Sequence, residues 1–268
     1  WVIEAIAITL NADTFLCHDD STQITSTVNG GSGLYQYQWS PSNLLVDATI
    51  ANPLTFGLTS TTTFILTVTD SAGCTQVDSI TINVNPQLTA EIDLVGPACV
   101  GDTLTLQGSF GGGTPAYSFQ WSPTVGLVSP NDPITQVLGL TTNTAYFFTV
   151  TDSRGCVAVD SFFVQLNTPL TLNVMGDTTI CYGDSIVLGS TPGGGQGSYT
   201  FSWSPASELV DNTVEDPQTR ALFADQTFYV ELNDGAGCNA FATLTVFVND
   251  ELLADAGADQ TFCFGGNA

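Results

Sequence analysis

Short runs in which apolar and polar residues alternate recur along the chain and predict β-strands. In residues 35–39 (Tyr-Gln-Tyr-Gln-Trp) every second residue is aromatic, which places three aromatic side chains on one face of a strand. Residues 64–69 alternate in the same way, a turn follows at Asp70–Gly73, and residues 75–84 alternate again. Short strands, frequent turns and the lack of a helical pattern predict an all-β protein built as an antiparallel β-sandwich.

The whole pattern returns every 82 residues. The aromatic strand keeps its tryptophan, a tyrosine four residues earlier and a proline two residues later. The members are Tyr35, Tyr117 and Tyr199; Trp39, Trp121 and Trp203; and Pro41, Pro123 and Pro205. The cysteines form two more series with the same spacing: Cys17, Cys99, Cys181 and Cys263, and Cys74, Cys156 and Cys238. Five series with one period indicate a tandem array of one structural unit.

Hinges containing Asn or Pro recur near Asn85-Pro86, Thr168-Pro169 and Asn249-Asp250 and suggest where one unit ends. They divide the chain into a tail of a preceding repeat (1–4), repeat 1 (5–86), repeat 2 (87–168), repeat 3 (169–250) and the opening strand of a fourth repeat (251–268). We expect a piece of a longer protein or a processed subunit. Each full repeat is predicted to be an immunoglobulin-like sandwich with its Tyr and Trp in the core.

Charge narrows the partners of this array. The chain carries 26 acidic residues and two basic ones, Arg154 and Arg220, for a net charge of −24. Nucleic acid is excluded as a partner because phosphate binding needs clustered Lys and Arg. An anionic membrane surface repels such a chain, and direct membrane insertion is not expected. The 43% of hydrophobic residues supply a core, so the acidic surface is interpreted as a solvated coat that keeps the array extended.

The cysteines are predicted to form disulfides in an oxidising compartment. No Cys-x-x-Cys motif and no second histidine accompany them, which argues against zinc. Two pairings stay open. Pairing within repeats gives Cys17–Cys74, Cys99–Cys156 and Cys181–Cys238, whereas pairing between repeats gives Cys17–Cys156 and Cys99–Cys238. In either case Cys263 needs a partner beyond these pairs.

The position of the first cysteine bears on this choice. It follows the start of its repeat by about a dozen residues, which at ~3.3 Å per residue is nearly the length of a sandwich. The first cysteine would then lie at the far end of its repeat, close to the next one. Since bonded cysteines need Cα atoms within about 7 Å, only one of the two schemes can hold.

Several segments together resemble a known kind of repeat. These are residues 254–263, the Cys-x-Gly-Asp motifs Cys99–Asp102 and Cys181–Asp184, and residues Thr61–Cys74. They are similar to the PKD-like, immunoglobulin-like repeats of bacterial secreted surface proteins such as gliding-motility-type adhesins, over essentially the whole chain. His18-Asp19 departs from the motif in repeat 1, and the Trp-Asp-Phe-Gly-Asp-Gly signature of strict PKD domains is absent. The resemblance implies stalks, spacers and adhesive arrays without catalytic positions.

Two series of aspartates recur at predicted turns. They are Asp20, Asp102 and Asp184 after the first cysteine, and Asp70, Asp152 and Asp234 before the second. Both series are expected to cap turns by hydrogen bonds from their side chains to the backbone. Calcium binding at Asp20, Asp102 and Asp184 is the alternative, although no Asp-x-Asp-x-Asp-Gly loop is present; no other cofactor is expected.

Short Asp-Ser/Thr-apolar triplets lie near the same turns. They place candidate hydroxyl groups at Ser71, Ser79, Thr103 and Ser185. The triplets resemble O-glycosylation sites in secreted proteins of the bacteria that use these repeats.

A non-enzymatic extracellular structural or adhesive protein, forming an extended rod, stalk or surface fibre, is the function that the pattern favours. No nucleophile, base or metal set recurs, so no enzyme is predicted. One alternative is a subunit of a surface filament assembled by strand donation or disulfide stapling. The other is a carbohydrate-binding module of a larger secreted enzyme. The expected partners are neighbouring repeats, copies of the chain itself and surface glycans.

Overall fold

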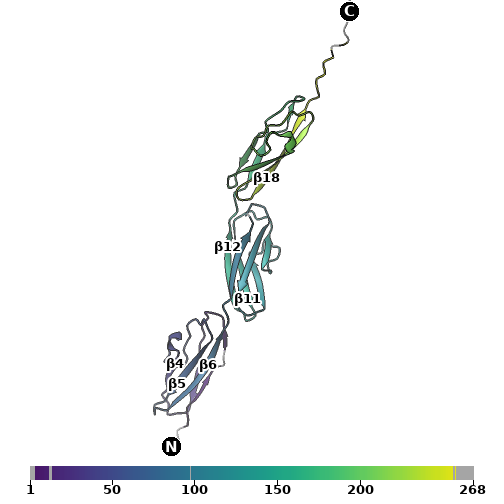
Figure 1. Ribbon diagram of the computed structural model, residues 1–268. Coiled ribbons are helices and arrows are strands. Elements are labelled where there is room, and N and C mark those ends of the chain that lie inside the picture. Colours follow the sequence, from purple (N-terminus) through teal and green to yellow (C-terminus); the bar gives the residue numbers. More distant parts are fainter. Residues whose placement is uncertain (1–3, 12–13, 97, 256, 258–268) are drawn as a thin grey trace, which may run out of the picture. The chain divides into compact units, whose positions relative to one another are not determined.

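The computed structural model describes residues 4–11, 14–96, 98–255 and 257 and shows a chain built from strands (Figure 1). The expected tail 1–4, apart from Glu4, and Cys263 lie outside the described residues. Two short 3-10 turns, η1 (Ser42–Leu44) and η2 (Ala206–Glu208), follow the aromatic strands of repeats 1 and 3. Among the described residues, no helix has the length and hydropathy needed to cross a membrane.

The chain divides into two compact units. Unit 1 comprises residues 1–96 and 103–164, and unit 2 comprises residues 97–102 and 165–268. Unit 1 therefore contains most of repeats 1 and 2, whereas unit 2 contains repeat 3 and a six-residue segment around Cys99.

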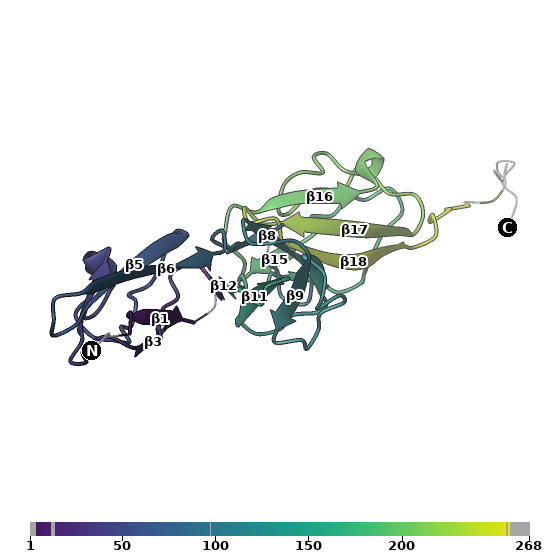
Figure 2. The ribbon, with the colours of Figure 1, turned by 90° about the horizontal axis from the view of Figure 1, so that it is seen from below.

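Repeat 1 consists of two sheets, which Figure 2 shows as separate layers. The first sheet pairs β1 (Ala7–Leu10) with β3 (Ser26–Asn29). The second has the order β2-β6-β5-β4, formed by β2 (Thr14–Leu16), β6 (Thr75–Val84), β5 (Thr62–Thr69) and β4 (Gln36–Ser40). Each of these sheets brings the apolar side of its alternating strands to the space between the layers.

Repeat 2 also has two sheets. One has the order β10-β8-β7, formed by β10 (Ile134–Val137), β8 (Leu104–Gly111) and β7 (Thr89–Val95). The other has the order β12-β11-β9, formed by β12 (Val157–Val164), β11 (Thr144–Asp152) and β9 (Tyr117–Ser122).

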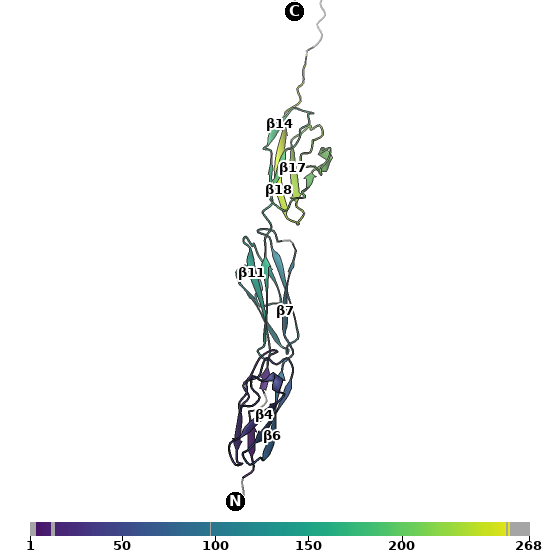
Figure 3. The same ribbon diagram turned by 90° about the vertical axis from the view of Figure 1, so that its left-hand side faces the viewer.

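Repeat 3, in unit 2, repeats the arrangement of repeat 1. Its smaller sheet pairs β13 (Thr171–Val174) with β15 (Ser190–Gly193). Its larger sheet has the order β14-β18-β17-β16, formed by β14 (Thr178–Ile180), β18 (Asn239–Val248), β17 (Gln226–Asn233) and β16 (Thr200–Ser204), and Figure 3 shows β14, β17 and β18 side by side.

Two strand pairs correct the expectation of a purely antiparallel sandwich. β2 runs parallel to β6, with Leu16 opposite Val84, and β14 runs parallel to β18, with Ile180 opposite Val248. The cause is a switch of sheets early in the repeat. After pairing with β3 the chain crosses to the other sheet, where the last strand of the repeat runs in the same direction. Alternation of side chains is the same in parallel and antiparallel strands, so the sequence pattern does not reveal this.

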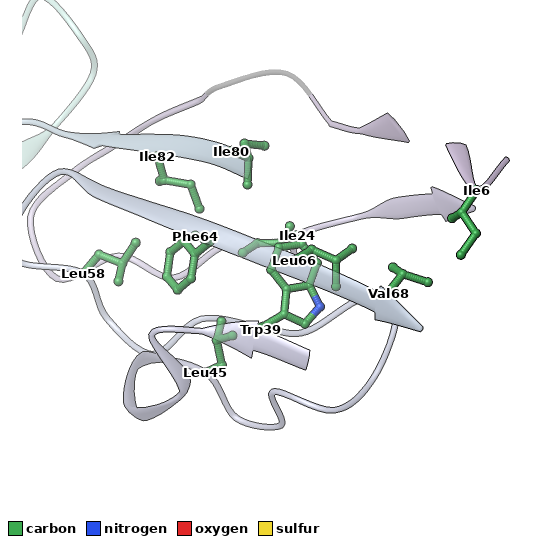
Figure 4. Packing of buried hydrophobic residues seen from close by; sticks show 10 residues of the cluster. All are labelled: Ile6, Ile24, Trp39, Leu45, Leu58, Phe64, Leu66, Val68, Ile80 and Ile82. Atoms are coloured by element: carbon green, nitrogen blue, oxygen red, sulfur yellow. The ribbon is translucent and has the colours of Figure 1, made fainter. Parts of the chain in front are cut away.

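The tryptophan of each repeat forms the centre of its core. Trp39, Trp121 and Trp203 are at most 1% exposed. Each indole N–H donates to a backbone carbonyl eleven residues later, at 3.0 Å in repeat 1, 2.8 Å in repeat 2 and 3.1 Å in repeat 3. This bond satisfies the polar atom that burial of the ring would otherwise leave unpaired. In repeat 1 the ring lies among the residues labelled in Figure 4: Ile6, Ile24, Leu45, Leu58, Phe64, Leu66, Val68, Ile80 and Ile82.

The tyrosines of the aromatic strands lie at the edge of the core, and Tyr35 packs against the core cluster of repeat 1. Tyr35, Tyr117 and Tyr199 are half-buried. Their hydroxyl groups donate to the carbonyl oxygens of Gly30, Gly112 (2.7 Å) and Gly194 (2.5 Å). Each tyrosine therefore fastens the glycine-rich loop that precedes its own strand, because a phenol keeps its polar end at the edge of a core.

Aromatic residues also lie on the outer faces of the sheets. Phe147, Phe163, Tyr229 and Phe241 are 43%, 59%, 57% and 70% exposed. The strands β11, β12, β17 and β18 carry apolar residues on both faces, so the strict alternation seen in the first aromatic strand is not general.

Truncating the core tryptophan should unfold its repeat selectively. Trp203→Ala leaves a cavity and an unpaired carbonyl, for which we expect a loss of about 3–5 kcal/mol of unfolding free energy. Since 1 kcal/mol shifts the melting temperature of a domain of this size by about 4–8 °C, one part of the thermal transition should move down by at least about 12 °C. Circular dichroism measures this shift. Phe241→Ala, an exposed aromatic in the same repeat, is the control, and an equal shift in both variants would contradict the assignment of the core.

Candidate functional site: the cysteine junctions

Each cysteine of the second series ends a tight turn that an aspartate organises. In repeat 2 the N–H of Asp152 donates to the carbonyl of Cys156 at 3.0 Å. The carboxylate oxygen Oδ1 of Asp152 accepts the N–H groups of Arg154 and Cys156, both at 2.9 Å. The other oxygen, Oδ2, accepts the N–H of Thr114 at 2.9 Å. One carboxylate thus holds the turn closed and ties it to the glycine-rich loop.

The other two repeats build the same turn. Asp70 accepts from the N–H groups of Ser32, Ala72 and Cys74, all at 2.9 Å. In repeat 3, Asp234 accepts from three equivalent backbone N–H groups at 2.9–3.1 Å. For this series, the predicted capping of turns by aspartate side chains is what the structure contains.

Glycine is required in the loop next to the aspartate turn, because the loop backbone has positive φ and comes close to its neighbours. Gly112 and Gly113 both have positive φ, at 69° and 63°. A Cβ on Gly112 would lie 1.8 Å from the carbonyl oxygen of Gln87, and one on Gly113 would lie 3.1 Å from Oδ2 of Asp152. Only glycine combines this backbone conformation with such a close approach.

Hydrogen bonding keeps these carboxyl groups ionised. The N–H of Ser32 is the main cause that lowers the pKa of Asp70, and the N–H of Cys238 is the main cause for Asp234. Burial acts in the opposite direction on the pKa of Asp152, but the N–H groups of Thr114, Cys156 and Arg154 outweigh it, so its pKa is also lowered.

The first series of aspartates does not behave as expected. The turns at Asp20, Asp102 and Asp184 are closed by their backbone N–H groups, which donate to the carbonyls of Cys17, Cys99 and Cys181 at 3.1, 3.4 and 3.1 Å. Their side chains are exposed, and none makes a hydrogen bond to its turn in the part of the chain that the structure describes. Within those same residues, no three His, Cys, Asp or Glu side chains gather into a metal site, so the calcium alternative receives no geometric support.

The disulfides of the structure join different repeats. Cys17 is bonded to Cys156, with their Cα atoms 5.5 Å apart, and Cys99 is bonded to Cys238, with their Cα atoms 5.7 Å apart. Both bonds therefore link a first-series cysteine to the second-series cysteine of the following repeat. Each bond lies within one compact unit, the first in unit 1 and the second in unit 2.

Pairing within repeats is not found. Cys74, the within-repeat alternative for Cys17, is unbonded and exposed, and so is Cys181, the within-repeat alternative for Cys238. Cys263 lies outside the described residues.

An asparagine accompanies each disulfide. The backbone N–H of Asn85 donates to the carbonyl of Leu16 at 2.8 Å, directly before Cys17, and its side-chain amide donates to Sγ of Cys156 at 3.3 Å. Asn85 is buried, at 7% exposure. The guanidinium carbon of Arg154 also lies 3.8 Å from the ring centroid of Phe15, a cation–π contact at the edge of this junction.

The second junction repeats the asparagine contact. The N–H of Asn167 donates to the carbonyl of Ala98 at 2.8 Å, and its side-chain amide donates to Sγ of Cys238 at 3.5 Å. Gln196 donates to the side-chain carbonyl of Asn167 at 3.3 Å. The sequence interpretation treated Asn85 and Asn249 only as hinge residues and did not single out Asn167. Their spacing of 82 residues, from Asn85 to Asn167 to Asn249, was the signal that could have identified them.

The candidate glycosylation residues lie at the surface. Ser71, Ser79, Thr103 and Ser185 are all exposed. The hydroxyl of Ser71 contacts that of Ser32 at 2.8 Å, and the hydroxyl of Ser185 accepts from Gln218 at 3.4 Å. Their modification stays a prediction.

No protein-family profile and no curated protein matches the sequence. Similar solved structures include the N-terminal eight Ig domains of Down Syndrome Cell Adhesion Molecule, at 13% identity and a TM-score of 0.48, covering 90% of this chain and 36% of that one. Three domains of the bacteriophage RB49 capsid protein Hoc match at 14% identity and a TM-score of 0.41, covering 94% and 100%. Mouse Cadherin-23 EC22-24 matches at 14% identity and a TM-score of 0.32, covering 92% and 100%. These values identify neither a family nor a function. The strands and junctions themselves define the class, which is tandem immunoglobulin-like β-sandwiches joined by disulfides.

Reduction should open the junctions without unfolding the repeats. No cysteine belongs to the hydrophobic clusters of repeat 1 or repeat 3. We therefore expect the far-ultraviolet circular dichroism and tryptophan fluorescence at 25 °C to be unchanged by a phosphine reductant. Thiol labelling before and after reduction verifies that the disulfides have opened. Loss of the β-sheet signal on reduction would mean that the disulfides hold the individual sandwiches together.

The turn aspartates should contribute stability in a defined pH window. Because the pKa of each is lowered in the folded state, the contribution is complete above the unfolded value of about 3.9 and is lost as pH falls through the folded pKa. An amide offers one acceptor oxygen where the carboxylate offers two. Replacing all three by asparagine should lower the melting temperature at pH 7, and the difference from wild type should shrink below about pH 4. The variant carries Asp70→Asn, Asp152→Asn and Asp234→Asn.

The matched control removes the same charge elsewhere. It carries Asp20→Asn, Asp102→Asn and Asp184→Asn, whose side chains are exposed and make no turn contact among the described residues. Calorimetry from pH 3 to 7 compares the three proteins. Equal effects of the two triple variants would assign the result to net charge alone and would refute the role of the turn carboxylates.

Proposed function

We propose that this chain is a non-enzymatic extracellular structural or adhesive repeat protein, in which immunoglobulin-like sandwiches form an extended rod, stalk or surface fibre. The observation that carries the proposal is that both disulfides join consecutive repeats at equivalent positions, Cys17–Cys156 and Cys99–Cys238. The effect of these bonds is to make the connection between successive repeats covalent at two points, the peptide linker and the disulfide.

A second covalent connection suits a protein that must resist bending or pulling. A single linker of Asn and Pro residues lets neighbouring sandwiches pivot, as the small interfaces between tandem domains usually do. A disulfide beside the linker restricts that motion. Because disulfides persist in oxidising compartments, the same bonds also support an extracellular location.

The charge of the chain is consistent with this proposal. A net charge of −24 without any lysine opposes the folding of the array back on itself. The resemblance to PKD-like repeats of bacterial surface proteins supports a stalk or adhesin at a cell surface. Neighbouring repeats, copies of the chain and surface glycans are its proposed partners, and nucleic acid is not among them.

Small-angle X-ray scattering tests the extended form directly. A compact protein of 268 residues has a radius of gyration of about 18 Å. Three sandwiches placed end to end, each about 35–40 Å long, give a rod with a radius of gyration of about 30 Å. We expect the larger value for the oxidised chain, and a broader distribution of distances after reduction.

A control separates the disulfides from the free thiols. The double variant Cys74→Ser, Cys181→Ser keeps both disulfides and should scatter like the oxidised wild type. A radius of gyration near 18 Å, in either protein, would rule out the rod.

A further inference from the structure

Two cysteines of the described chain have the surroundings of a junction but no partner. Cys74 ends a complete aspartate turn, in which Asp70 accepts the N–H groups of Ser32, Ala72 and Cys74 at 2.9 Å, as its counterparts do at the bonded Cys156 and Cys238. We call residues Asp70–Cys74 the free turn. It corresponds to the turn that carries the second-series cysteine in each bonded junction.

The other half of such a junction is present at Cys181. Asn249 donates its backbone N–H to the carbonyl of Ile180 at 2.9 Å, as Asn85 and Asn167 do next to the bonded Cys17 and Cys99. A cavity of about 550 Å³ opens at this place, and we call it the free socket. Its lining is formed by Cys181, Tyr182, Asn249, Asp250, Glu251 and Leu252.

The free socket is exposed where the two bonded junctions are covered. Asn85 is 7% exposed where its amide meets the sulfur of Cys156, whereas Asn249 is exposed. Bonded Cys99, Cys156 and Cys238 are 3–5% exposed, whereas Cys74 and Cys181 are exposed. Two large side chains beside the socket are also open to solvent. Tyr182 is 41% exposed and meets the ring of Phe223 edge-on, at 5.1 Å between ring centroids, and Leu252 is 96% exposed.

We propose that the free turn of one copy of this chain binds in the free socket of a second copy, and that Cys74 and Cys181 then form an intermolecular disulfide. The two junctions within the chain support this pairing, because there the same kind of turn and the same kind of asparagine-flanked cysteine bind each other across consecutive repeats. The inference rests on the proposed structural function and adds that copies of the chain bind each other head-to-tail. Because the turn and the socket are different surfaces, the contact is head-to-tail and can pass from one copy to the next.

The bond forms by thiol–disulfide exchange with a small oxidised thiol such as glutathione disulfide. The thiolate of Cys74 attacks one sulfur of glutathione disulfide, which releases one glutathione and leaves a mixed disulfide on Cys74. The thiolate of Cys181 in the second copy then attacks the Cys74 sulfur and releases the second glutathione. Two protein thiols are oxidised, one glutathione disulfide is reduced, and two protons leave with the thiols.

Complementary single-thiol variants test this proposal. All proteins carry Cys263→Ser, so that Cys74 and Cys181 are the free thiols. The background protein, oxidised in a glutathione redox buffer, should give a ladder of dimers, trimers and longer species on a non-reducing gel. Cys74→Ser alone and Cys181→Ser alone should each stay monomeric. An equal mixture of these two variants should give a dimer that does not grow further, with a Cys74–Cys181 peptide identified by mass spectrometry.

Two further measurements separate recognition from simple thiol reactivity. Asn249→Ala in the Cys74→Ser partner should slow formation of the mixed dimer severalfold, because the amide that contacts the incoming sulfur is lost; Asn131→Ala, an exposed asparagine of repeat 2, is the control. Raising the salt concentration from 20 to 500 mM should speed dimer formation, because it screens the repulsion between two chains of charge −24.

Three results would overturn the proposal. They are dimers of either single variant by itself, a Cys74–Cys181 bond closed within one monomer, and equal rates for the Asn249→Ala and Asn131→Ala partners. None of these affects the scattering test of the rod. Conversely, a compact scattering profile together with specific mixed dimers would refute the rod and retain the junction between copies.

Discussion

The carboxylate that opens each Gly-Cys turn is the interaction on which the junctions depend. In repeat 2 the two oxygens of Asp152 accept three backbone N–H groups, and they fix both the turn that presents Cys156 and the glycine-rich loop beside it. Glycine at position 113 has a positive φ of 63°, and a Cβ there would lie 2.8 Å from Cδ1 of Leu88 and 3.1 Å from Oδ2 of Asp152. The carboxyl is 5% exposed and ionised, so an uncompensated loss of its partners would leave a buried charge. The Asp152 carboxylate therefore fixes the backbone that presents Cys156 to Cys17.

Much of the fold could be predicted from the sequence because burial leaves a periodic trace. The 82-residue period, the aromatic strands and the tryptophan cores all follow from residues whose side chains must be apolar at fixed intervals. The parallel pairing of β2 with β6 left no such trace, because direction does not change which residues face the core. For a related reason, the sequence did not reveal that the tyrosines are only half-buried. Tyr117 lies on the same strand face as Trp121, but at the end of the sandwich, where its hydroxyl reaches the loop carbonyl of Gly112.

The junctions were predictable only in part. Spacing restricted Cys17 to two partners, and the length of the first strands favoured the pairing between repeats without excluding the pairing within them. The role of Asn85 was missed because asparagine in a hinge has an ordinary explanation in turn formation, whereas its amide lies against a sulfur 71 residues away in the sequence. Asp20 was given a capping role that belongs to the backbone alone in that turn. The disulfide and the asparagine contact depend on residues distant in sequence, which local pattern does not encode, whereas the Asp20 turn is local and is closed by the backbone.

The two junctions share some contacts and differ in others. Arg154 stacks on Phe15 at the first junction, but the corresponding residues at the second are Ala236 and Pro97, which cannot form a cation–π pair. The disulfide, the asparagine contact to sulfur and the aspartate turn are the features that both junctions share. The aspartate turn and the asparagine contact therefore position the two sulfur atoms in the same way at both junctions, and the disulfide makes each link covalent.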